Sequence, residues 1–158
     1  MTPPHVAEPR ARNPVAARAT GSRPILLATL AVPFAPEASA LAVDTAVEAG
    51  APLLVANVVV LPPLGMSVNM GYDQIDETPE DARALRAPAE LAHALGVAVE
   101  RVRVRSPRPV AALLELTAER EPALLVFGPD PSRLRAGRYA RAARAVRAGA
   151  PCLVWTPA

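Results

Sequence analysis

The chain has 158 residues, 51% of them hydrophobic, and a formal net charge of only +2. This length and composition predict one domain that buries enough surface to fold without a metal or a disulfide. All 17 basic residues are arginine, and they are spread over several predicted elements without interleaved aromatic residues, so we expect no nucleic-acid partner.

No apolar run approaches the ~20 residues that span a bilayer, so we expect no membrane association. The single cysteine, Cys152, excludes an internal disulfide and favours a reducing, cytoplasmic location. Residues 1–22 are rich in proline, alanine and arginine and show no apolar period. They predict a disordered N-terminal tail, followed by one domain at residues 23–158.

An alternative interpretation of the N-terminal segment is a secretory signal peptide. Several arginines precede the apolar run PILLATLAVPFA and the triplet Ala38-Ser39-Ala40, in the order that a signal peptide has. If residues 1–40 were removed in this way, the protein would be an exported binding protein. We favour the cytoplasmic interpretation, because Pro33 breaks the apolar run and cleavage would remove the first predicted strand.

The first half of the domain alternates strands and helices. The apolar run at residues 25–32 predicts a strand buried on both faces. Residues 37–49 carry apolar side chains at helical spacing, and Gly50 follows as a helix stop. Residues 52–61, rich in β-branched side chains, predict a second buried strand. The long loop at residues 61–78 has a length that is usually functional or mobile.

The middle of the domain predicts a helix and an edge strand. Thr78 and Pro79 are a capping residue and a first helical residue, so a helix begins here and runs to Leu95. Pro88 lies inside it and is expected to kink or split it. Residues 97–105 alternate between apolar and polar side chains, which indicates a half-exposed edge strand.

The last part repeats the pattern. Helices are predicted at residues 109–120 and 138–148, and strands at 123–127 and 152–156. Strands that alternate with helices in this way indicate an α/β fold, with a parallel sheet covered on both faces. Ligands of such folds bind beyond the carboxyl ends of the strands.

The loop after the fourth predicted strand is the main candidate for binding. Gly128 ends the strand, a proline-rich loop follows, and Arg138 and Arg141 lie in the first turn of the next helix. Free N–H groups and the helix dipole favour an anion at such a place. The two arginines oppose the dipole, and a bound anion would relieve that conflict. The alternative is an amphipathic helix with a solvated arginine face.

No other residues indicate catalysis. His93 has no second metal ligand at a suitable spacing, and Cys152 has no histidine partner. The acidic residues near Thr78 fit a solvated helix cap better than a pair of catalytic carboxylates. We therefore expect no metal site, no catalytic residue and no enzymatic activity.

The element order, with the segments ILLATL, LLVANVVV, ALLVFG and GAPCLVW, resembles the universal stress protein family over about residues 23–157. The resemblance implies a Rossmann-like three-layer sandwich, similar to adenine nucleotide alpha hydrolases, with a five-stranded parallel sheet of order 3-2-1-4-5. It also implies a stress-response or regulatory role, a bacterial source, and a homodimer that is often formed through the last strand, here Cys152–Thr156. One subclass of the family binds ATP and the other does not.

The chain departs from the motif that the ATP-binding subclass carries. The aspartate at the end of the first strand matches Leu30. In the Gly-x-x-Gly, nine residues, Gly-Ser/Thr motif, the first glycine matches Gly128, but the second falls on Pro131, which has no N–H. The final pair falls on Ala140-Arg141 or, with a gap, on Gly137-Arg138. The resemblance therefore implies a member whose usual ATP site is degraded and which uses no cofactor.

Ligand binding remains open in another form. The cleft that the resemblance implies would be lined by Ala28, Thr29, Leu30, Val58 and Gly128. Arg133, Arg138 or Arg141 could neutralise a phosphate by an unusual route, so ATP or AMP is the alternative ligand. We expect a non-catalytic homodimer that acts by binding a protein partner or a small ligand.

Overall fold

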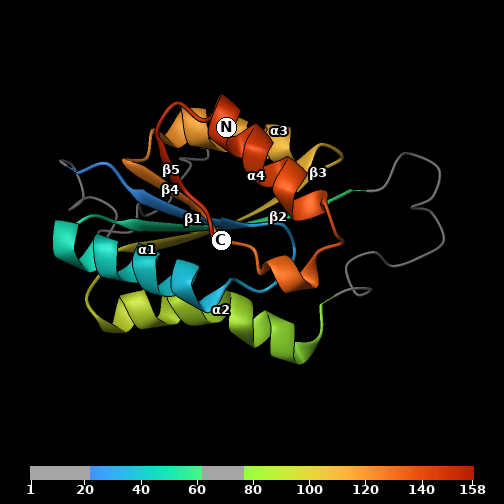
Figure 1. Cartoon of the computed structure of the whole chain (residues 1–158). Helices are drawn as coiled ribbons and strands as arrows, with labels where there is room; N and C mark the ends of the chain where they lie inside the picture. Colours follow the sequence, from blue (N-terminus) through green and yellow to red (C-terminus); the bar gives the residue numbers. More distant parts are fainter. Residues whose placement is uncertain (1–21, 62–76) are drawn as a thin grey trace, which may run out of the picture.

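A computed structural model describes residues 22–61 and 77–158. The predicted tail therefore lies outside the described residues except for Ser22, and the predicted loop at 61–78 lies largely outside them. Within these described residues, five strands and four α-helices alternate (Figure 1). In order they are β1 (Ile25–Thr29), α1 (Pro36–Ala49), β2 (Leu53–Val60), α2 (Pro79–Ala94), β3 (Val99–Ser106), α3 (Pro109–Arg120), β4 (Leu124–Phe127), α4 (Arg138–Gly149) and β5 (Leu153–Trp155).

The strands form one parallel sheet in the order β3-β2-β1-β4-β5, which confirms the predicted fold class and strand order. Helices α1 and α2 cover one face of the sheet, and α3 and α4 cover the other (Figure 1). Strand β1 lies at the centre of the sheet. The chain first adds β2 and β3 on one side of it and then β4 and β5 on the other side, so the strand order reverses at β1. The carboxyl end of β1 is therefore the switch point at which this class of sheet holds ligands.

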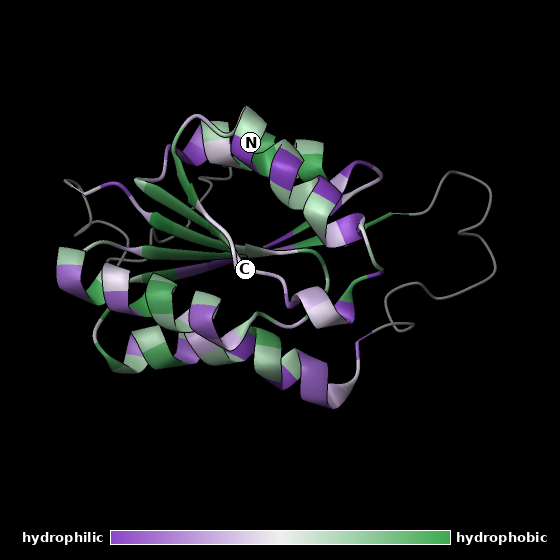
Figure 2. Ribbon diagram, in the orientation of Figure 1, coloured by the Kyte–Doolittle hydropathy of each residue, from purple (hydrophilic) through white to green (hydrophobic). Residues whose placement is uncertain are grey.

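Alternate residues of the central strands enter two separate apolar clusters. Ile25 and Leu27 pack toward α1 and α2, whereas Leu26 and Ala28 pack toward α3 and α4. Because both faces are covered, the inner strands are apolar except for Thr29 and Asn57, as the green strands at the centre of Figure 2 show. The edge strand β3 keeps the predicted alternation, with Arg101, Arg103 and Arg105 exposed and Val102 and Val104 packed on the α3 side.

Two expectations about the elements need correction. Strand β1 ends at Thr29 rather than at residue 32, because Ala31 adopts a left-handed conformation with φ of 58° and turns the chain. Helix α2 is not split at Pro88, which lies inside one continuous helix. Pro88 and Ala89 are both buried, and the stability gained from this packing offsets the cost of the helical hydrogen bond that a proline cannot donate.

None of the helices within residues 22–61 and 77–158 is long and apolar enough to cross a membrane.

Candidate functional site

The loops that follow β1 and β4 are bound to each other at the carboxyl edge of the sheet. The N–H of Ala35 donates to the carbonyl of Gly128, and the N–H of Asp130 donates to the carbonyl of Pro33, both at 2.9 Å. Phe34 and Pro129 form an isolated antiparallel bridge between these bonds. The two loops therefore form one hydrogen-bonded unit beside the switch point.

The turn after β1 is fixed by side chains as well as by backbone. Thr29 Oγ1 donates a 2.6 Å hydrogen bond to the carbonyl of Val32. The N–H of Ala31 donates to Asn57 Oδ1 of the neighbouring strand at 2.9 Å. Asn57 lies opposite Thr29 in the register of β1 and β2, which brings its side chain to the turn. This arrangement holds Ala31 in its left-handed conformation.

The residues predicted to line a nucleotide cleft lie together but are enclosed. Ala28, Thr29 and Val58 have no exposed surface, Leu30 is 2% exposed, and Gly128 is buried. Ala28, Leu30 and Val58 belong to the apolar cluster beneath α3 and α4, which also contains Phe127. These side chains fill the core at the switch point and line neither of the two cavities described below.

Gly128 has a packing role that does not depend on a ligand. A Cβ atom at this position would lie 2.3 Å from the Cβ atom of Ala38 in the first turns of α1. Its N–H donates to the carbonyl of Ala28 at 2.9 Å. The missing side chain lets α1 approach the end of β4, and the backbone donor is already used within the sheet.

The turn after Gly128 also satisfies its own donors. Pro131 begins a short 3-10 helix, Pro131–Arg133, and has no N–H. The N–H and the hydroxyl of Ser132 both donate to Asp130 Oδ1, at 2.9 and 2.7 Å. A carboxylate of the chain thus takes up the donors that this turn offers.

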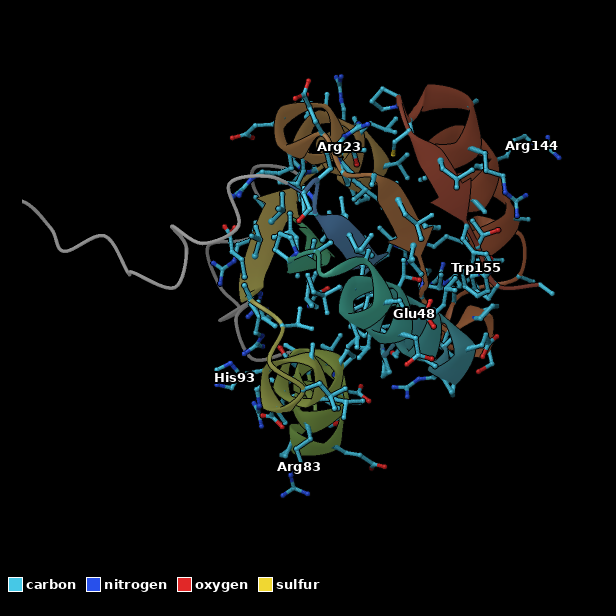
Figure 3. The ribbon with its side chains drawn as sticks, turned by 90° about the vertical axis from the view of Figure 1, so that its left-hand side faces the viewer. Arg23, Glu48, Arg83, His93, Arg144 and Trp155 are labelled. Atoms are coloured by element: carbon cyan, nitrogen blue, oxygen red, sulfur yellow. The ribbon has the colours of Figure 1, made fainter. Side chains whose placement is uncertain are left out.

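The predicted residues at the start of α4 are solvent-facing. Gly137 precedes the helix with φ of 80°, a conformation that glycine adopts without strain. Arg138 and Arg141 are exposed and make no ion pair with any residue of the described ranges. On the same helix Tyr139, Ala142 and Val146 pack on the sheet, and Arg144 points away from it (Figure 3).

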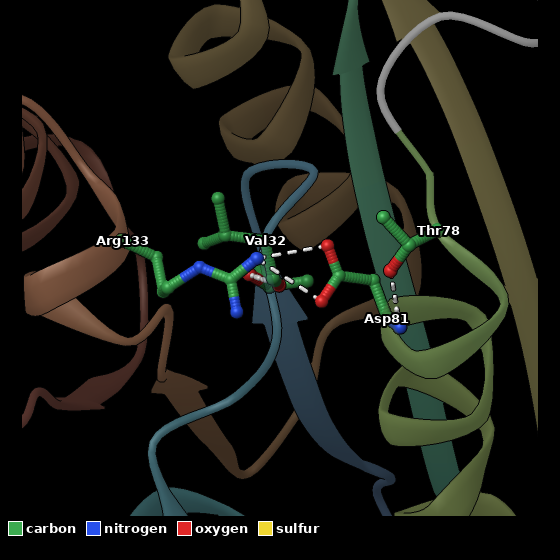
Figure 4. Close-up of polar contacts among 5 residues, drawn as sticks. Val32, Thr78, Asp81 and Arg133 are labelled. Carbon is green, nitrogen blue, oxygen red and sulfur yellow. Dashed lines mark hydrogen bonds and ion pairs between the residues drawn. The ribbon is translucent and has the colours of Figure 1, made fainter.

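Arg133 is the third predicted arginine and the only one of the three that is paired. Its Nη2 atom lies 3.0 Å from Asp81 Oδ1 and 2.8 Å from Oδ2. Arg133 follows β4, and Asp81 lies in the first turn of α2, which follows β2. Because β1 lies between these strands, the ion pair spans the end of β1, in front of the Val32 turn in the view of Figure 4. The Asp81 N–H also donates to the capping Thr78 Oγ1 at 3.1 Å.

A cavity of about 270 Å³ lies on the α2 side of the sheet, beside the middle of β2 and β3, where Asn57 is level with the end of β1. Its apolar wall is formed by Phe34, Val55 and Leu85. Its polar groups are Asn57, Glu77, Arg101 and Arg103. This site was not predicted from the sequence. Asn57 was the available signal, because it is the only polar residue in the otherwise apolar strand LLVANVVV.

A second cavity, of about 620 Å³, lies between α4 and the C-terminal residues and includes Tyr139, Arg144 and Pro157. Tyr139 donates a 2.6 Å hydrogen bond to the carbonyl of Pro157, and Arg147 donates to Thr156 Oγ1. These bonds fix the C-terminal segment along α4.

The remaining candidates for chemistry are isolated. His93 points away from α2 into solvent (Figure 3). No group of three or more metal-binding side chains forms within residues 22–61 and 77–158. Burial raises the pKa of the Cys152 thiol, which lowers its thiolate fraction at neutral pH.

The fold and sequence together identify the family. The sequence matches the family model described as "Universal stress protein family" over residues 21–156, so the chain belongs to the universal stress protein family. No curated protein sequence is similar enough to this chain to count as a match.

Solved structures of this family share the fold. A universal stress protein family member from Burkholderia pseudomallei superposes with a TM-score of 0.63 at 23% identity, over 85% of this chain and 95% of that one. A universal stress protein in complex with cAMP gives a TM-score of 0.57 at 22% identity, over 86% and 96% of the two chains. The Archaeoglobus fulgidus universal stress protein in complex with dAMP gives 0.55 at 19% identity, over 84% and 95%.

Proposed function

We propose that this chain is a non-catalytic, regulatory universal stress protein that acts by binding, and whose usual adenine-nucleotide cleft is closed. The main support is Leu30. It stands where the ATP-binding subclass is expected to carry an aspartate, and its side chain is 2% exposed within the apolar cluster of α3 and α4. A buried leucine neither accepts hydrogen bonds from a ribose nor leaves space for one.

The phosphate end of the cleft supports the same proposal. A phosphate would need backbone donors in the turn after β4. There Pro131 has no N–H, and Asp130 accepts the donors of Ser132. The Asp130 carboxylate would also repel a phosphate, because two like charges at close range disfavour each other. The family's phosphate turn is thus replaced by one that is already satisfied.

The ion pair between Arg133 and Asp81 is a further obstacle to a nucleotide. It spans the end of β1, at the switch point where this class of sheet holds its ligands. The Asp81 side chain is only 15% exposed, so a ligand that displaced Arg133 would leave a largely enclosed carboxylate without its partner.

The proposal includes a homodimer formed through the segment Cys152–Thr156. Strand β5 is an edge of the sheet, and Leu153 in it is 72% exposed, which is unusual for a leucine in a strand. A protein partner is the other candidate for this edge.

We propose that the protein is located in the cytoplasm, because its lone cysteine suits a reducing compartment. The intact mass of the protein from its native cells tests this, since loss of residues 1–40 would instead indicate export.

A second candidate function is the binding of ATP or AMP by an unusual route. It is favoured by two solved structures of similar fold, which contain cAMP and dAMP. In this chain the exposed Arg138 and Arg141 at the start of α4 would hold the phosphate.

Thermal unfolding with millimolar ATP or AMP, with and without Mg²⁺, separates the two candidates. A ligand at ~100 times its Kd stabilises the folded state by about 2.7 kcal/mol, which raises the melting temperature by several degrees. We expect no such shift for this chain. The Archaeoglobus fulgidus protein with dAMP is the positive control. If ATP raises the melting temperature of this chain, and if the double variant R138Q/R141Q does not show that rise, the second candidate is established and the first is contradicted.

A further inference from the structure

The cavity beside α2 has a lining that matches one class of ligand. It lies on the face of the sheet that is covered by α1 and α2, whereas Ala28, Leu30 and Val58 pack on the opposite face. Its lining therefore shares no residue with the cleft that the family resemblance implies, although Thr29 of that cleft lies opposite Asn57 in the register of β1 and β2. Its volume of about 270 Å³ is just below the range of ~300–1,000 Å³ that is usual for small-molecule pockets, so only a compact ligand would fit.

Arg101 is the first of its polar groups. It lies on β3 opposite Val55 of β2, and it makes no hydrogen bond or ion pair with any described residue. A guanidinium carries five N–H donors in a fixed fork that suits a carboxylate. Arg101 lies beside the apolar Val55 and Leu85, which offer it no acceptor. A bound anion would supply the acceptor that its guanidinium lacks.

Asn57 and Arg103 lie opposite each other in the register of β2 and β3. Asn57 Oδ1 accepts the Ala31 N–H, so the orientation of the amide is fixed and its Nδ2 group remains available to donate into the cavity. Arg103 Nη2 lies 3.7 Å from Glu77 Oε2, longer than a hydrogen bond, so its N–H groups also remain available.

The charges of the lining select the charge of the ligand. Arg101 and Arg103 contribute two positive charges and Glu77 one negative charge, which leaves a net charge of +1. A doubly charged phosphate would lack one neutralising charge, whereas a monocarboxylate would be neutralised. Phe34, Val55 and Leu85 offer an apolar surface to the rest of the ligand.

We propose that this cavity binds a small monocarboxylate with a compact apolar or aromatic body. The carboxylate lies between Arg101, Arg103 and the Asn57 amide, and the body lies against Phe34 and Leu85. The inference goes beyond the proposed function and does not depend on it, because no residue of the nucleotide cleft takes part.

The test is an NMR titration of the full-length, ¹⁵N-labelled chain with sodium benzoate at constant ionic strength. Benzamide, which has the same shape without the charge, is the comparison ligand. We expect saturable shifts at Asn57, Arg101 and Arg103 with benzoate and much weaker binding of benzamide. R101Q should raise the Kd for benzoate roughly tenfold or more, because a hydrogen bond to a charged group is lost.

Two further variants control the titration. R83Q removes an arginine that points from α2 into solvent (Figure 3) and should leave the Kd unchanged. N57D keeps an oxygen for the Ala31 N–H but replaces the amide donor by a negative charge, and should abolish benzoate binding even if R101Q fails to fold. Equal binding of benzamide, or R101Q and N57D proteins that bind benzoate as R83Q does, would overturn the proposal. AMP is titrated separately: shifts at Gly128 and Gly137 would contradict the closed nucleotide cleft and leave the carboxylate site intact.

Discussion

Gly128 and Ala38 approach so closely that one added carbon would not fit between them. A Cβ atom on Gly128 would lie 2.3 Å from the Cβ atom of Ala38, and 3.7 Å from its Cα atom. Ala38 is fully buried in the cluster between α1 and the sheet. The position of α1 against the end of β4 therefore depends on a glycine at residue 128.

We predict that Gly128→Ala lowers the free energy of unfolding by about 1–3 kcal/mol, the usual cost of overpacking a core. Chemical denaturation measures it. Gly149→Ala is the matched control: its added Cβ would meet only the end of the Leu114 side chain, which can rotate away. We expect little change there, and a similar loss in both variants would contradict the packing role of Gly128.

We predict that Ala31→Gly raises the free energy of unfolding by about 1 kcal/mol. Ala31 has φ of 58°, where a Cβ atom is strained and glycine is not. The comparison is Ala145→Gly, at an exposed position inside α4, where the same change should lower stability by about 1 kcal/mol. Opposite signs for the two variants are the expected result, and a loss at both positions would exclude backbone strain at Ala31.

We predict a measurable coupling between Arg133 and Asp81. A double-mutant cycle with R133Q and D81N should give a coupling energy of about 0.5–1 kcal/mol. The short bonds favour a value at the upper end for a surface ion pair, and the 46% exposure of the Arg133 side chain keeps it from being larger. High salt should reduce this coupling. The pair Arg86 and Glu90, at 3.7 Å on the surface of α2, should couple less strongly. Equal coupling energies would show that the contact across the end of β1 contributes nothing beyond an ordinary surface ion pair.

We predict that Cys152 reacts slowly with iodoacetamide at neutral pH. Burial raises the pKa of its thiol, although a backbone hydrogen bond from Leu125 and the charge of Arg23 act in the opposite direction. A raised pKa leaves less thiolate, and the thiolate is the reactive form. Alkylation should be slower than that of glutathione at the same pH, and should accelerate when urea unfolds the chain. An equal rate in the native protein would show that the thiol is neither shielded nor perturbed.

Much of the fold was predictable because buried parallel strands have a simple signature. The runs around Leu26, Leu54 and Leu125 are apolar throughout, and the alternation of Arg101, Val102 and Arg103 marks an edge. The end of β1 was not predictable in the same way, since the conformation of Ala31 depends on the Asn57 side chain from another strand.

The candidate site was harder to predict for a related reason. The resemblance placed Leu30, Val58 and Gly128 at one end of the sheet, where they do lie together. It gave no information about how deeply they are buried, which depends on the packing of α3 and α4. The cavity with Arg101 and Asn57 forms only when α2 is placed over β2 and β3, and its residues come from segments far apart in the sequence.

The two edges of the sheet differ in a way that limits assembly. One edge, β3, carries Arg101, Arg103 and Arg105, and such charges discourage another strand from adding to it. The other edge, β5, is only three residues long and presents Leu153 to the outside. If two copies paired through their β5 strands, the two free edges of the joined sheet would both be β3, the strand that carries the arginines. If the proposed pairing through β5 forms, growth of the joined sheet would stop at two copies and give a closed pair, not a fibre.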